Sequence, residues 1–173
     1  MKKILFISLI AILTTTLISA QSIKTERMLY SWNNMKKMVV NSVKKMPEAH
    51  FSYAPTKGLR TFDEQVKYLT RSNRIFISKL TEIDVKIANK NTKEQVKGKE
   101  AIIRDLEASF DLVIASIPKI KSIDQNIILF GQKTSKMEGL MFMTDYLNQQ
   151  HGKLMIYMHM KGVEPVKSTS WLQ

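Results

Sequence analysis

The chain has 173 residues, of which 44% are apolar, enough for one packed domain and too many for a disordered tail. Lysine and arginine number 27 against 15 acidic residues, which gives a formal net charge of +12. The sequence has no cysteine, and this excludes disulfides, a thiolate nucleophile and a thiolate-rich zinc site.

The first twenty residues have the layout of a secretory signal peptide. Two lysines precede an apolar run at 4–18 that threonines interrupt, and small residues follow it up to Ala20. We expect cleavage after Ala20 and a periplasmic or secreted protein, with a bundle at 21–165 and a tail at 166–173. Loss of the two lysines lowers the charge from +12 to +10. No other stretch reaches the ~20 apolar residues of a membrane span, so none is expected in the mature chain.

Apolar residues at steps of three and four predict four amphipathic helices along the rest of the chain. The expected helices are Met28 to Met46, Thr61 to Ile83, a third that starts near Asn91 and ends at Ile117, and Ser135 to Gly162. Capping-box patterns open the second and the last, a similar signal near Asn91 and Thr92 opens the third, and prolines end the first and the third. Each apolar stripe must be buried against another helix, so the sequence predicts an all-α four-helix bundle.

Two long connections join these helices. Pro47 to Arg60 contains two aromatic residues, and we expect it to lie against the core rather than project into solvent. Lys119 to Thr134 carries an apolar patch at Ile127 to Phe130 before a glycine, and no alternating strand pattern is visible in it. Trp171 and the following leucine are expected to dock on the bundle.

Two stretches resemble the DinB-like (damage-inducible, YfiT-related) helical bundles. The segment Phe51 to Phe62 is similar to the family's aromatic-rich link into its second helix. The segment His151 to Tyr157, followed by Gly162 to Pro165, is similar to its last helix and exit. The likeness covers about Ile23 to Pro165, nearly all of the mature chain.

The resemblance implies an up-down-down-up bundle that is often dimeric. It also implies a divalent metal held by three histidines, one from the second helix and two, four residues apart, from the last. Some such relatives are thiol-dependent transferases or isomerases. The matching positions here are Tyr68, Leu147 and His151, so one histidine of three is present. A tight site needs three or four donors, and a leucine removes one.

We therefore expect a degenerate metal site and a protein without catalysis, either a small-ligand-binding or a structural module. Its pocket would be floored by Tyr68, Leu147 and His151, with His151 hydrogen-bonded to a neighbour such as Tyr68. Four more residues are candidates for the pocket wall: Trp32, Tyr53, Thr144 and Asn148.

Two alternatives remain open at this point. One is a divalent-metal-dependent hydrolase or transferase in which His151, with Tyr68, Thr144 or Asn148 as weak oxygen donors, binds zinc, nickel or manganese. The other is a surface-interaction protein that uses its basic faces on anionic envelope polymers. Nucleic acid is not an expected partner, because the lysines are scattered over several helices instead of lining one groove.

Overall fold

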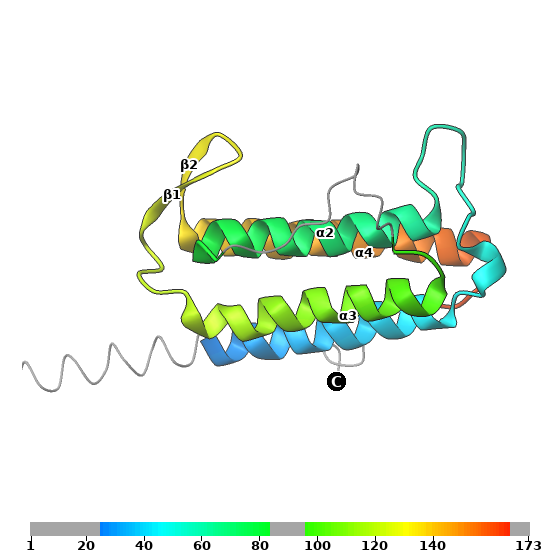
Figure 1. The fold of residues 1–173 in the computed structure, drawn as a ribbon, viewed down its shortest axis with the longest axis horizontal. Helices are drawn as coiled ribbons and strands as arrows, with labels where there is room; N and C mark the ends of the chain where they lie inside the picture. The colour runs from blue at the N-terminus through cyan, green and yellow to red at the C-terminus, as the bar shows by residue number, and fades with distance from the viewer. Residues whose placement is uncertain (1–24, 84–95, 167–173) are drawn as a thin grey trace, which may run out of the picture.

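The computed structural model describes residues 25–83 and 96–166. The predicted signal peptide, the expected start of the third helix near Asn91 and the docking of Trp171 lie outside these residues. A helix occupies residues 25–45 and is followed by a short 3₁₀ helix, Glu48–His50. The remaining helices are α2 at Phe62–Thr81, α3 at Lys99–Ser116 and α4 at Lys136–Met160 (Figure 1).

The helix ends follow local sequence signals. Thr61 precedes α2, and the Glu64 carboxylate accepts a hydrogen bond from the Thr61 backbone N–H at 2.9 Å. Ser135 caps α4, because its hydroxyl accepts from the Glu138 N–H at 3.2 Å. The capping boxes predicted for α2 and α4 are therefore confirmed, and the signal predicted near Asn91 lies outside the described residues. The third helix begins later than expected, at Lys99, directly after Gly98.

Side chains from all four helices meet in one apolar core. Within it α2 packs against both α3 and α4, and the Trp32 ring lies 6.0 Å from the ring of Phe110 on α3. The last helix buries Leu140 and leaves Met141 60% exposed, so Leu140 lies on its apolar stripe and Met141 does not. Large side chains with less than 2% of their surface exposed come from every helix: Trp32, Met46, Phe62, Leu69, Ile77, Leu106, Phe110, Leu147 and Leu154.

The first part of the connection between the first helix and α2 lies against one end of the bundle, as predicted, but residues 56–60 are exposed and project as a loop (Figure 1). Phe51 is 6% exposed, and its ring meets that of Phe62 edge to face at 5.2 Å. The Tyr157 hydroxyl on α4 donates to the Arg60 carbonyl at 2.8 Å. Backbone and aromatic contacts thus hold this link in place before α2 begins.

The expectation of an all-α fold was wrong at one point. The second connection forms a two-stranded antiparallel sheet, β1 at Asn126–Leu129 and β2 at Gln132–Ser135. Leu129 is 6% exposed and faces the bundle, whereas Ile128 on the opposite side of the strand is 63% exposed. Four-residue strands are too short for an alternating pattern to stand out in the sequence. Across the described residues, no helix is both long and apolar enough to span a bilayer.

Candidate functional site

His151 lies in the interior of the bundle with an unpaired nitrogen. It is on α4, one turn after Leu147, and its side chain is 7% exposed. Its Nε2 is buried and has no hydrogen-bond partner in the described part of the chain, so this nitrogen does not make the expected bond to Tyr68. Burial lowers the pKa of the His151 imidazole, because desolvation disfavours the charged ring. The structure therefore places a neutral imidazole with a free nitrogen in the core.

Tyr68, at another of the three family positions, is engaged elsewhere. The guanidinium of Arg60 lies 3.7 Å from the centre of its ring, a cation–π distance. Tyr146 on α4 packs against the same ring, with centroids 6.3 Å apart. Tyr68 is only half-buried and Arg60 is exposed. The phenol thus belongs to a cluster near the surface between α2 and α4.

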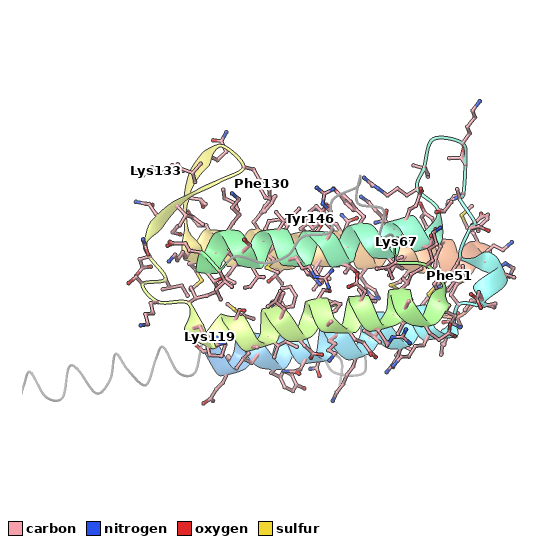
Figure 2. All side chains as sticks on the ribbon, viewed as in Figure 1. Phe51, Lys67, Lys119, Phe130, Lys133 and Tyr146 are labelled. Carbon is pink, nitrogen blue, oxygen red and sulfur yellow. The ribbon has the colours of Figure 1, made fainter. Side chains whose placement is uncertain are left out.

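The second tyrosine of this cluster has a shifted acidity. Burial, together with hydrogen bonding to Tyr68, raises the pKa of Tyr146 to about 12. Figure 2 shows Tyr146 beside α2 on the side of the bundle that also carries Phe130. A phenol of this pKa stays protonated near neutral pH and is a poor metal ligand, since oxygen ligands bind best when deprotonated.

The proposed pocket-wall residues are dispersed. Trp32 is 1% exposed and packs in the core, where its indole N–H also has no partner among the described residues. The Tyr53 ring lies 6.3 Å from the Tyr157 ring, and the Lys161 ammonium lies 4.7 Å from the centre of the Tyr53 ring. Tyr53 is therefore at the end of α4. The Thr144 hydroxyl donates to the Leu140 carbonyl of its own helix at 2.9 Å.

Asn148, the remaining pocket-wall candidate, is exposed. The structure therefore brings Leu147 and His151 together on one stripe of α4. Among the described residues, no hydrogen bond, ion pair or ring contact joins His151 to Tyr53, Tyr68 or Asn148.

A buried amide pair next to His151 was missed by sequence reasoning. The Gln65 Nε2 donates to the Gln150 Oε1 at 2.6 Å, and the two residues are 2% and 1% exposed. They join α2 to α4 immediately before His151 in the sequence. The available signal was an amide on each apolar stripe: Gln65 lies beside Val66, and Gln150 lies three residues after Leu147.

The residues at the three positions that the resemblance matches to metal ligands do not fit a three-donor site. Leu147 contributes no ligand atom, and Tyr68 is held in the surface cluster. Within the described ranges, no group of three or more histidine, cysteine, aspartate or glutamate residues lies close enough together to hold a metal ion. The one donor that remains is the Nε2 of His151.

Solved structures that share this fold include two DinB-like proteins. One is a DinB-like protein from Bacillus subtilis (YjoA), with a TM-score of 0.67 and 16% identity, aligned over 82% of this chain and 96% of that one. The other is a DinB-like protein from Bacillus cereus ATCC 10987, with a TM-score of 0.67 and 14% identity over 82% and 95% of the two chains. No family model and no curated protein matches the sequence. At these identities the likeness shows the fold alone.

Proposed function

Starting from this DinB-like fold, we propose that the protein is an exported helical bundle whose metal centre has decayed. It acts without catalysis, as a small-ligand-binding or structural module in the periplasm or outside the cell. The observation that carries the proposal is the pairing of a buried Leu147 with a His151 whose Nε2 has no partner in the described residues. One imidazole without supporting donors offers a hydrogen bond rather than a metal cage.

We also propose the up-down-down-up order of helices, which sets which helices line the interior near His151. The ion pairs Lys36–Asp111 and Lys44–Glu107 support an antiparallel first helix and α3, since residue numbers rise on one and fall on the other. The Gln65–Gln150 contact, with Gly139 near Leu80, supports the same for α2 and α4. In Figure 1 α2 and α3 run in one direction. A homodimer stays a prediction.

Binding at His151 would use the neutral ring. Because burial lowers its pKa, the ring is uncharged near neutral pH, and Nε2 is free to donate or accept one hydrogen bond, depending on the tautomer. The buried Gln65–Gln150 hydrogen bond shows that this part of the interior holds other polar atoms between α2 and α4. One neutral hydrogen-bonding nitrogen suits a small neutral molecule or an ordered water better than an ion.

Calorimetric titration with zinc, nickel and manganese tests the proposal. We expect residues 21–173 to show no stoichiometric site tighter than about 1 μM, because a single imidazole cannot compete with water for these ions. His151→Ala should leave the titrations unchanged, as should the control His159→Ala, whose side chain is 54% exposed. Tight binding that His151→Ala abolishes and His159→Ala preserves would refute the proposal.

That outcome would favour the alternative, a divalent-metal-dependent hydrolase or transferase built on His151 with unusual oxygen ligands. The unpaired Nε2 of His151 supports this alternative, since histidine binds metals through a neutral ring nitrogen.

A further inference from the structure

Apolar side chains are exposed together at the end of the bundle where α4 begins. Ile128 on β1 is 63% exposed, and Phe130 after it is 59% exposed. Met141 and Phe142, near the start of α4, are 60% and 51% exposed. Phe130 and Phe142 are linked through Phe76, at centroid distances of 5.2 and 5.7 Å. Exposed apolar groups gathered in this way mark an interaction surface.

The turn between the strands presents Phe130 at an energetic cost. Phe130 and Gly131 form a two-residue loop with φ angles of +50° and +83°. Such loops favour Asn-Gly or Gly-Gly, because a side chain in the left-handed region costs about 1–2 kcal/mol. The ring gains an edge contact with Phe76 but still shows more than half of its surface to solvent. Packing inside the protein therefore accounts for only part of the presence of a phenylalanine at this turn position.

Exposed positive charge lies at the same end of the bundle as these apolar groups. Lys119, Lys121 and Lys133 are exposed and make no ion pair with other described residues. Lys133 pairs directly across the ladder with Ile128, so the two side chains share one face of the hairpin. Figure 2 shows Lys119, Phe130 and Lys133 at this end of the molecule.

The acidic residues nearby are largely engaged. Glu138 accepts hydrogen bonds from the Ser135 backbone N–H and the Thr134 hydroxyl, and Glu82 lies 3.8 Å from the buried Lys136. Within 117–138 this leaves Asp124 as the other carboxylate to offset three free lysines. The hairpin end is therefore basic as well as apolar.

We propose that the hairpin end, defined by Ile128, Phe130, Lys119, Lys121 and Lys133, binds the surface of an anionic lipid bilayer. Ile128 and Phe130 insert at the level of the headgroups, and the lysines contact lipid phosphates. The exposed apolar groups favour a bilayer over a soluble polyanion, which would use the lysines alone. This inference is independent of the metal question at His151.

Co-sedimentation of residues 21–173 with vesicles tests the proposal. We expect binding to equimolar phosphatidylglycerol and phosphatidylcholine, little binding to phosphatidylcholine alone, and weaker binding as salt rises. Phe130→Asn should weaken binding about tenfold, because an aromatic ring no longer inserts. This variant keeps the hairpin, since Asn-Gly is the favoured sequence for such a turn. Lys119→Glu should weaken binding at least about fivefold.

Matched controls come from the opposite end of the bundle. Leu59→Ser removes an apolar side chain that is 52% exposed, and Lys57→Glu reverses an exposed lysine in the same link. Both should bind vesicles as the parent does, and circular dichroism should give every variant the parent's helicity. Equal binding to both vesicle types would overturn the proposal. So would equal losses in the two sets of variants, or a Phe130→Asn protein that binds unchanged.

Discussion

Among single residues, His151 is the one whose position has the clearest consequence for stability. Burial lowers its pKa in the folded protein, whereas an unfolded chain keeps a histidine pKa near 6.5. In the interval between the two pKa values the unfolded state binds a proton that the native state does not. The free energy of unfolding must therefore fall as pH falls from about 6.5 toward the lower native value.

We expect His151→Leu to remove this acid dependence. Near neutral pH the variant should be more stable than the parent by about 1 kcal/mol, since it replaces a buried nitrogen without a partner by an apolar group. The difference should grow on mild acidification. Urea unfolding across the pH range measures both effects, with His159→Leu, at a histidine that is 54% exposed, as the control. A loss of stability at neutral pH would mean that Nε2 has a partner.

The residue types alone predicted which metal ligands the site lacks, whereas the packing of the helices determined where the candidate side chains lie. The count of one histidine at three family positions needed no structure. The placement of the Tyr68 side chain could be learned only from the structure, because it depends on contacts with Arg60 from the link and Tyr146 from α4. The Gln65–Gln150 bond was equally out of reach, since the register of α2 against α4 determines which buried amides meet.

At the scale of elements, local signals were reliable and weak signals failed. The capping boxes at Thr61 and Ser135 were found from the sequence because each one involves residues three apart on one helix. The hairpin was missed because Asn126–Leu129 is a short apolar cluster rather than an alternating strand. Its turn begins with Phe130 where an asparagine would have revealed it.

Two glycines of α4 should respond in opposite ways to alanine. A Cβ on Gly139 would lie 2.6 Å from the Leu80 Cδ2, so Gly139→Ala forces Leu80 to move and should destabilise by about 1–2 kcal/mol. A Cβ on Gly152 meets nothing within 4 Å. Gly152→Ala should therefore stabilise by about 0.5–1 kcal/mol through helix propensity alone. Thermal unfolding of both variants checks this contact between α2 and α4, and equal shifts would contradict it.

For the molecule as a whole, the ion pairs raise the free energy of unfolding and the repulsion within the net positive charge lowers it. Three acidic side chains of α3 bind basic partners on neighbouring helices: Asp111 with Lys36, Glu107 with Lys44, and Asp105 with Arg74, at 2.5 to 2.6 Å. The two pairs that involve lysine are the more exposed ones and contribute about 0.2–1 kcal/mol each. The pair of Arg74 with Asp105 is part-buried and makes two hydrogen bonds. The three pairs reinforce the packing of α3 but leave most of the net charge of +12, or +10 without the two leading lysines, uncompensated.

The excess charge predicts that salt stabilises the bundle. Sodium chloride screens both the ion pairs and the mutual repulsion of the lysines, and repulsion involves many more charges. We expect the midpoint of thermal unfolding to rise by about 3 °C between low and moderate salt, which corresponds to about 1 kcal/mol for a chain of this size. Lys97→Glu combined with Lys153→Glu, at two exposed positions, lowers the net charge by four and should reduce the salt response. A midpoint that falls as salt rises would mean that the pairs on α3 outweigh the repulsion, and α3 would then be held chiefly by charge.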